Sequence, residues 1–178
     1  MRTRSVRRAR NLVLIGFMGT GKSTVGKMCA KRLGYAFCDS DAVIEERVGC
    51  TIPELFATQG EAVFRQKERE VIAELALTPN LVIATGGGVV MDAENVANLR
   101  AEGLVILLRA TPEVILKRVG DARSRPLLAV GSDPQARIEE LLSLRAEQYE
   151  RAAHLRLDTT DRSVPEIVTE AVRLYRRK

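Results

Sequence analysis

Short apolar runs alternate with longer segments of helical periodicity along most of the chain. Five such runs predict strands, at residues 11–15, 36–39, 81–84, 103–108 and 154–158. Apolar residues at helical spacing predict the helices between them, at residues 22–33, 43–48, 53–77, 91–101, 112–119, 134–151 and 165–176. Because strands that alternate with helices form a parallel sheet covered on both faces, the pattern predicts an α/β fold, a three-layer α/β/α domain with a five-stranded parallel sheet.

Residues 120–133 follow neither period. The segment begins with Gly120, includes Gly131 and carries Arg123 and Arg125. Loops of this length in compact domains are usually functional lids or disordered segments, and the arginines favour a lid that closes over phosphate. A surface loop with solvated arginines is the alternative. We therefore expect a mobile lid at about 120–133.

Charge divides the chain into two parts. The 178 residues are 46% hydrophobic and 29% charged, which is enough for one domain with a sizeable core. The net charge is +5, and residues 1–10 alone contain five arginines and no acid. We therefore predict a basic N-terminal arm, 1–10, and a single domain, 11–178. A solvated terminus is common, and no aromatic pattern for base stacking accompanies the arginines, so we expect no nucleic-acid partner.

The remaining composition bears on compartment and assembly. No apolar run approaches the roughly 18 residues that a membrane span requires, so we expect no membrane partner. The three cysteines, Cys29, Cys38 and Cys50, lack CxxC spacing and indicate reduced thiols in the cytoplasm. A single domain with no obvious spare apolar face favours a monomer.

The clearest chemical motif follows the first predicted strand. Residues 16–23, GFMGTGKS, fit the phosphate-binding pattern G-x-x-x-x-G-K-[ST] in full, between a strand and a helix. This geometry lets backbone N–H groups converge on a phosphate, with Lys22 reaching the β- and γ-phosphates and Ser23 holding Mg²⁺. The motif predicts binding of a nucleoside triphosphate.

Two further loops follow predicted strands. Asp39-Ser40-Asp41 ends the second strand, where carboxylates can serve Mg²⁺ or accept hydrogen bonds from a substrate hydroxyl. The pleat would send Asp39 and Asp41 to one side if the strand continued, whereas Asp41 alternatively caps the next helix. Residues 85–88, TGGG, end the third strand, and three glycines there favour close approach of a small molecule to the backbone.

Two arginines occupy positions that a plain scaffold does not require. Arg145 continues the apolar stripe of residues 134–151, and a buried guanidinium needs an anionic partner. Arg65 lies one turn from Glu68, which can pair with it. Each could belong to an internal ion pair. Together with the aspartates and the glycines, they suggest a pocket for a small, hydroxylated carboxylate.

The motifs together resemble the shikimate kinase family, in the nucleoside monophosphate kinase-like branch of P-loop proteins. The matching segments occur in family order: GFMGTGKST (16–24), DSD (39–41), FATQGEAVFRQKE (56–68), ATGGGVV (84–90), SRPLL (124–128) and LRAEQY (144–149). The resemblance spans residues 11 to about 165. It implies an enzyme that transfers the γ-phosphoryl group of MgATP to the 3-hydroxyl of shikimate, on the route to chorismate and the aromatic amino acids.

The resemblance also implies roles for individual residues. Asp41 would bind the substrate hydroxyls and help take up the proton of the attacking one. The other shikimate-binding residues would be Arg65, Gly87, Gly88 and Arg145, with the arginines on the carboxylate. Lys22 and Arg125 would join Asp41 as catalytic residues, Arg125 from the lid.

ATP and the metal would use the P-loop and its surroundings. The implied ATP-binding residues are Gly19, Thr20, Gly21, Lys22, Ser23, Thr24, Arg118, Arg125 and Arg162, with Arg118 and Arg162 flanking the adenine. Ser23 would ligate Mg²⁺, and Asp39 would hold it through water. Other interpretations are a related small-molecule kinase, such as a gluconate kinase, and a non-catalytic nucleotide-binding module.

Overall fold

The computed structural model describes residues 10–120, 128 and 133–178. Its strands are β1 (Asn11–Ile15), β2 (Ala36–Asp39), β3 (Leu81–Ala84), β4 (Gly103–Arg109) and β5 (Leu155–Asp158). Its helices are α1 (Lys22–Leu33), α2 (Ser40–Val48), α3 (Ile52–Leu77), the short 3₁₀-helix η1 (Val89–Met91), α4 (Ala93–Glu102), α5 (Pro112–Val119), α6 (Pro134–Ala152) and α7 (Val164–Arg176).

The strands form one parallel sheet in the order β2-β3-β1-β4-β5. β1 lies in the centre, between β3 and β4, and the chain crosses from one side of it to the other after β3. The five-stranded parallel sheet and the α/β class are therefore confirmed. Ligands of such sheets bind where the strand order reverses, at the carboxyl ends of the strands.

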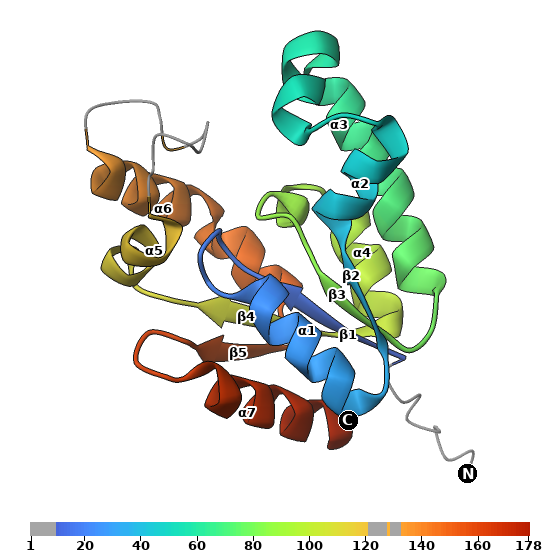
Figure 1. Ribbon diagram of the computed structural model, residues 1–178, viewed down its shortest axis with the longest axis vertical. Helices are drawn as coiled ribbons and strands as arrows, with labels where there is room; N and C mark the ends of the chain where they lie inside the picture. The colour runs from blue at the N-terminus through green and yellow to red at the C-terminus, as the bar shows by residue number, and fades with distance from the viewer. Residues whose placement is uncertain (1–9, 121–127, 129–132) are drawn as a thin grey trace.

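Both faces of the sheet are covered by helices. Successive side chains of β1 point to opposite faces, so Val13 and Ile15 join one core cluster while Leu12 and Leu14 join the other. The first cluster packs against α2, α3 and α4, and the second against α1 and α7. Figure 1 shows these layers, with α1 and α7 on one side of the sheet and α3 and α4 on the other.

A third, smaller core cluster supports the P-loop. Phe17 packs there with Ile115 of α5 and with Ile138 and Leu141 of α6. Leu128, the one described residue of 121–132, is buried in the same cluster. The remainder of the predicted lid, including Arg123 and Arg125, lies outside the described residues.

The starts of two helices differ by two or three residues from those that the sequence predicts. α2 begins at Ser40, three residues before the predicted start at residue 43, because the Asp39 carboxylate accepts a hydrogen bond from Asp41 N–H and caps the helix. The predicted helix at 91–101 begins at Ala93, after η1 and the capping residue Asp92. α3 also departs from helical geometry at Gly60, which has φ 83° and ψ 171°.

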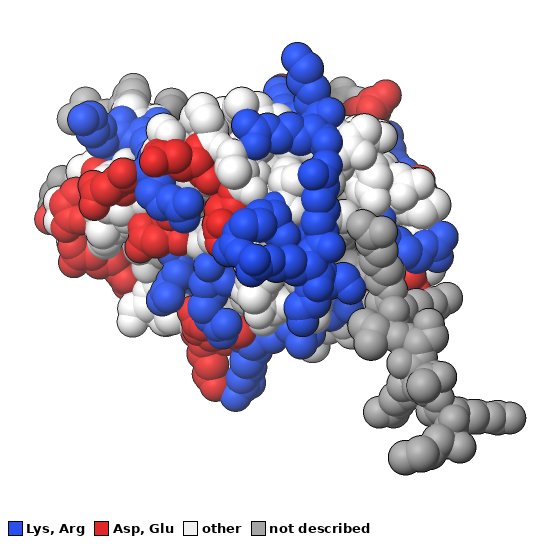
Figure 2. Space-filling view, turned by 90° about the horizontal axis from the view of Figure 1, so that it is seen from below, with Lys and Arg blue, Asp and Glu red and all other residues white. Residues whose placement is uncertain are grey.

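Lysine and arginine side chains gather on the face seen from below α1 and α7 (Figure 2). The last turn of α1 carries Lys31 and Arg32, and the last turn of α7 carries Arg173 and Arg176. Arg32 connects the two helices through a hydrogen bond to Thr169. Within the described ranges, no helix is both long enough and apolar enough to cross a membrane.

Candidate active site

The predicted functional segments meet at the carboxyl edge of the sheet. Because β1 pairs with both β3 and β4, the P-loop after β1 lies beside the TGGG turn after β3. β3 pairs in turn with β2, so Asp39 lies opposite Ala84, the residue before the turn. The strand order thus brings together segments that are far apart in the sequence.

The P-loop presents the N-terminus of α1 to a ligand. Gly21 occupies the N-cap and offers no side-chain cap, so the first N–H groups of the helix remain available to an anion. The loop itself is held by the buried Thr20, whose hydroxyl donates to Phe17 O at 2.8 Å. Thr24 is exposed on the first turn of α1. These residues form a phosphate cradle.

Lys22 is half-buried in the loop. Its ammonium group donates to Gly16 O and Phe17 O, both at 2.8 Å. Burial lowers the pKa of Lys22 to about 8, against the opposing attraction of Asp41 and Asp39. The ammonium is therefore charged at neutral pH and lies near both carboxylates.

Ser23 and Asp39 fit a magnesium site. Ser23 Oγ donates to Asp39 Oδ2 at 2.7 Å, so a hydroxyl and a carboxylate from two elements face one another beside the P-loop. Hard oxygen donors of this kind suit Mg²⁺, which binds one or two protein oxygens together with substrate phosphates. The described residues contain no cluster of three or more histidine, cysteine or acidic side chains, so such a site would depend on the nucleotide as well.

Asp41 lies in a low-dielectric position next to the TGGG turn. Burial, followed by the charges of Asp39 and Glu68, raises the pKa of Asp41 to about 6, although Lys22 opposes the shift. Asp41 Oδ1 is buried without a hydrogen-bond partner among the described residues. A Cβ at Gly86 would lie 2.4 Å from this oxygen, so a side chain there would displace the Asp41 carboxylate. An unpartnered carboxylate oxygen of this kind can accept a hydrogen bond from a ligand hydroxyl.

The sequence-based reasons for Asp41 need correction. β2 ends at Asp39, so the strand does not continue and its pleat does not align the two aspartates. The alternative in which Asp41 caps the helix is also wrong, because Asp39 is the N-cap and Asp41 belongs to the first turn of α2. Both carboxylates nevertheless act on Lys22.

Arg65 approaches the turn from α3. Its guanidinium pairs with Glu68 at 2.8 Å and with Glu61 at 3.2 Å. Glu68 is only 1% exposed, which makes this a largely buried pair and confirms the predicted contact. The Arg65 guanidinium also lies 3.0 Å from the position of a Cβ at Gly88. The guanidinium thus reaches the turn, while Glu61 and Glu68 neutralise its charge.

Arg145 approaches the same turn from α6. Its guanidinium donates to Gly87 O at 3.4 Å and lies over the Phe17 ring, 5.9 Å from the centroid. No carboxylate among the described residues pairs with it. Two guanidinium groups and the Asp41 carboxylate therefore surround one glycine turn, as the suggested pocket requires.

The three arginines predicted to bind ATP differ from one another in their surroundings. Arg118 of α5 donates to Thr159 Oγ1 at 2.9 Å and to Thr159 O at 2.5 Å, and its Nη1 lies 3.5 Å from Gly19 O. It therefore lies beside the P-loop. Arg162 is exposed before α7, and its described interactions are electrostatic, with Glu166 and Glu170. Arg125 lies outside the described residues.

Three hydroxyl residues join the site without having been predicted. Ser40 accepts a hydrogen bond from Gly86 N–H at 3.0 Å, and Tyr149 donates one to Gly87 O at 2.6 Å. Thr159 is completely buried and connects the end of β5 to Arg109 O and Arg118. Serine, threonine and tyrosine are frequent in sequences, and no spacing pattern distinguishes these three.

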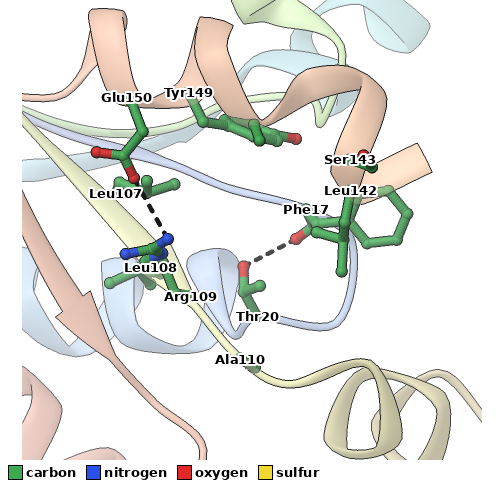
Figure 3. Close-up of a pocket in the computed structure, with 11 residues that line it drawn as sticks. Phe17, Thr20, Leu107, Leu108, Arg109, Ala110, Leu142, Ser143, Tyr149 and Glu150 are labelled. Atoms are coloured by element: carbon green, nitrogen blue, oxygen red, sulfur yellow. Dashed lines mark hydrogen bonds and ion pairs between the residues drawn. The ribbon is translucent and has the colours of Figure 1, made fainter. Parts of the chain in front are cut away.

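A separate cavity of about 290 Å³ lies between the P-loop, the end of β4 and α6. Figure 3 shows Phe17, Thr20 and Tyr149 among its walls, with the Arg109–Glu150 ion pair of 3.5 Å on another side. Of the predicted site residues, only Thr20 lines it. The cavity therefore lies next to the cluster around the TGGG turn and is not part of it.

Comparison with known proteins agrees with this geometry. A sequence model described as shikimate kinase matches residues 18–176. A shikimate kinase from Caldanaerobacter subterraneus subsp. tengcongensis is 45% identical over 166 residues, 93% of this chain and 96% of that protein. The structure of a shikimate kinase from Acinetobacter baumannii in complex with shikimate has a TM-score of 0.89 and 36% identity, covering 95% of this chain and 94% of its own.

The same fold also occurs in a kinase of low sequence identity. A gluconokinase from Sinorhizobium meliloti 1021 has a TM-score of 0.58 and 19% identity, which reflects a shared fold alone. The family model and the curated relative instead span nearly the whole chain and share one activity. The family model and this relative confirm the resemblance to the shikimate kinase family that the sequence motifs indicate. The chain belongs to the shikimate kinase family, ATP-dependent phosphotransferases that act on a hydroxyl group.

Proposed function

We propose that the chain transfers the γ-phosphoryl group of ATP to the 3-hydroxyl of shikimate, yielding shikimate 3-phosphate and ADP. The observation that carries the proposal is the convergence of Asp41, Arg65 and Arg145 on the glycine turn next to the P-loop. A hydroxylated monocarboxylate complements this set, because it can offer an anion to the guanidinium groups and a hydroxyl to the carboxylate. Shikimate has both groups.

The acid end of the substrate would bind between α3 and α6. Arg145 has no carboxylate partner among the described residues, so a substrate carboxylate would supply the missing negative charge. Arg65 is already paired with Glu68 and Glu61, and so it would contribute directed N–H donors more than net charge. Gly87 and Gly88, without side chains, would let the substrate approach the backbone.

The reacting hydroxyl would lie at Asp41. The carboxylate would accept the proton as the substrate oxygen bonds to the γ-phosphorus and the bond to the β–γ bridging oxygen breaks, releasing ADP. The environment that raises the pKa of Asp41 to about 6 makes it a stronger base than an exposed aspartate while leaving it ionised at neutral pH. Asp41 would thus orient the hydroxyl and remove its proton.

The phosphate end would bind across the P-loop. Backbone N–H groups between Gly19 and Thr24 would hold the phosphates, and Lys22 would stabilise charge on the transferred group. Ser23 would ligate Mg²⁺ directly and Asp39 would hold it through water, and the bound ion would neutralise charge on the β- and γ-phosphates. Arg118 and Arg162 would flank the adenine, and Arg125 would close over the phosphates from the lid at 120–133.

Further proposals concern the chain as a whole. We propose a basic arm at 1–10 and one kinase domain at 11–178, acting as a cytoplasmic monomer without nucleic-acid or membrane partners. All three cysteines are free thiols, which suits a reducing compartment. Sedimentation of the purified chain at several concentrations would test the monomer.

Release of ADP in a coupled assay tests the main proposal. The enzyme is incubated with MgATP and shikimate, gluconate or no acceptor. We expect turnover with shikimate and only background with gluconate, the acceptor of the related kinases. Tight ATP binding without turnover of shikimate would overturn the proposed substrate.

A further inference from the structure

The backbone of the turn formed by residues 85–88, here the glycine turn, depends on other segments for its position. Thr85 is fixed to β1, since both its N–H and its hydroxyl donate to Leu14 O, at 3.2 and 3.3 Å. The following residues, 86–88, are glycines and have no side chains that could anchor them. They nevertheless separate Asp41 from Arg65 and Arg145, so an error in their position would displace the substrate.

We infer that Ser40 and Tyr149 are positioning residues that clamp the glycine turn between the reacting carboxylate and the two arginines. Ser40 Oγ accepts from Gly86 N–H at 3.0 Å, and Tyr149 Oη donates to Gly87 O at 2.6 Å. The two hydroxyls therefore hold successive residues of the turn, from α2 and from α6. The inference rests on the proposed function and concerns the same site.

Ser40 connects the turn to Asp41. It is completely buried and is the residue immediately before Asp41, in the first turn of α2. Its bond to Gly86 fixes the distance between α2 and the turn, where Asp41 Oδ1 and Gly86 are already in close contact. Loss of the hydroxyl would leave the buried Gly86 N–H without an acceptor, and the turn would shift relative to Asp41.

Tyr149 connects the turn to Arg145. The two residues are four apart on α6, so they lie on the same face of the helix and both reach Gly87 O. Tyr149 is 4% exposed, and burial raises the pKa of its phenol to about 12, so it remains a donor at every physiological pH. One helix thereby holds both the turn and the guanidinium that faces the substrate.

Tyr149→Phe tests the clamp with little change in packing. The ring remains in the core cluster that it shares with α3 and α4, while the hydroxyl's bond to Gly87 O and its interaction with Arg145 are lost. We expect the KM for shikimate to rise about tenfold, which is the effect of one net hydrogen bond, while the KM for ATP stays within about twofold of the parent value. Ser40→Ala should also raise the KM for shikimate, and it should lower kcat as well, because residue 40 adjoins Asp41.

Tyr175→Phe is the matched control. Tyr175 is equally buried, but it lies on α7, across the sheet, where its hydroxyl contacts that of Tyr35 at 3.3 Å. We expect its variant to keep both KM values, whether or not its melting temperature falls. Thermal unfolding of all variants separates a stability defect, which lowers the active fraction and kcat alone, from a displaced turn, which raises the KM for shikimate.

The outcomes distinguish the clamp from the proposed function. No turnover of shikimate by the parent enzyme would refute the function and the clamp with it. Normal parent turnover with an unchanged KM for shikimate in a folded Tyr149→Phe enzyme would refute the clamp alone. If Tyr149→Phe does not fold, Ser40→Ala decides, because an unchanged KM and kcat in that variant would equally overturn the inference.

Discussion

At the scale of single residues, the Asp41 carboxylate is surrounded by groups that disfavour its charge. Burial and the carboxylates of Asp39 and Glu68 raise its pKa to about 6, and Lys22 compensates only in part. A group whose pKa is higher in the folded than in the unfolded state stabilises the fold at low pH, and this stabilisation is lost as the pH rises to about 6. At neutral pH Asp41 therefore lowers the stability of the enzyme that it serves.

Asp41→Asn should separate stability from activity. The amide has almost the same shape without the charge, so we expect a higher melting temperature at pH 7 together with a loss of at least about a hundredfold in kcat, as for other groups that act in proton transfer. Calorimetry and the coupled assay measure the two effects. A lower melting temperature would show that the charged form of Asp41 stabilises the site.

Arg145→Ala should affect the acid substrate and spare the nucleotide. The variant removes a guanidinium that has no carboxylate partner among the described residues. Hydrogen bonds to charged groups contribute about 1.5–3 kcal/mol, so the Kd for shikimate should rise roughly 10- to 150-fold. Titration with shikimate and with ATP measures both affinities.

Arg151→Ala, on the same helix, controls for the loss of an arginine. Arg151 is exposed and pairs with Glu147, away from the glycine turn. We expect both affinities to remain at the parent values in this variant. Equal weakening of shikimate and ATP binding by Arg145→Ala would show that Arg145 supports the fold and not the ligand.

At the scale of elements, the sequence predicts the strands well because each is a short apolar run. The bounds of β1, β2 and β3 agree with the predicted ranges, and those of β4 and β5 differ by one residue. The rule that parallel strands end at one edge also brings Lys22, Asp41 and the TGGG turn together. Ser40 and Tyr149 could not be predicted, because their bonds join residues 46 and 62 positions apart and depend on how α2 and α6 pack.

The interruption of α3 was missed for another reason. Apolar residues at helical spacing continue on both sides of Gly60, so the period gives no sign of a break, yet Gly60 has φ 83° and ψ 171°. Across this break the ring of Phe56 packs on that of Phe64, with centroids 4.8 Å apart. The kink thus shapes the segment that carries Arg65.

Gly60→Ala should therefore disturb both stability and substrate binding. A side chain is disfavoured at this φ and ψ, at a cost of about 1–3 kcal/mol, which corresponds to a drop of roughly 2–12 °C in melting temperature for a chain of this size. We also expect a higher KM for shikimate, since Arg65 lies five residues beyond the kink. Gln59→Ala, at the adjacent exposed position, should change neither quantity. A parent-like melting temperature in Gly60→Ala would mean that α3 readily becomes straight.

At the scale of the whole molecule, part of the basic surface follows from the topology. In a parallel α/β fold the helices return from the carboxyl to the amino edge of the sheet, so their C-terminal turns collect at the edge opposite the active site. Those turns carry negative partial charge and favour cations. Basic residues occur in the last turns of α1, α4, α6 and α7, helices that return to this edge. Of these turns, those of α1 and α7 belong to the layer seen in Figure 2 and contribute to its positive face.

Deletion of residues 2–9 tests whether the arm has a separate purpose. Arg10 should be retained, because its N–H donates to Glu102 O and its carbonyl accepts from Asn80 N–H, which attaches it to the sheet. The deletion removes Arg2, Arg4, Arg7 and Arg8 and reduces the net charge from +5 to +1. Every residue proposed to bind ATP or shikimate lies beyond position 15. We therefore expect kcat and both KM values to stay within about twofold of the parent values, which is less than the loss of one hydrogen bond would cause.

Binding of a single-stranded oligonucleotide to both proteins, at low and at physiological salt, tests for a nucleic-acid partner. Salt-resistant binding by the full chain alone would assign the arm a nucleic-acid partner, whereas a loss of turnover would make the arm part of the kinase domain.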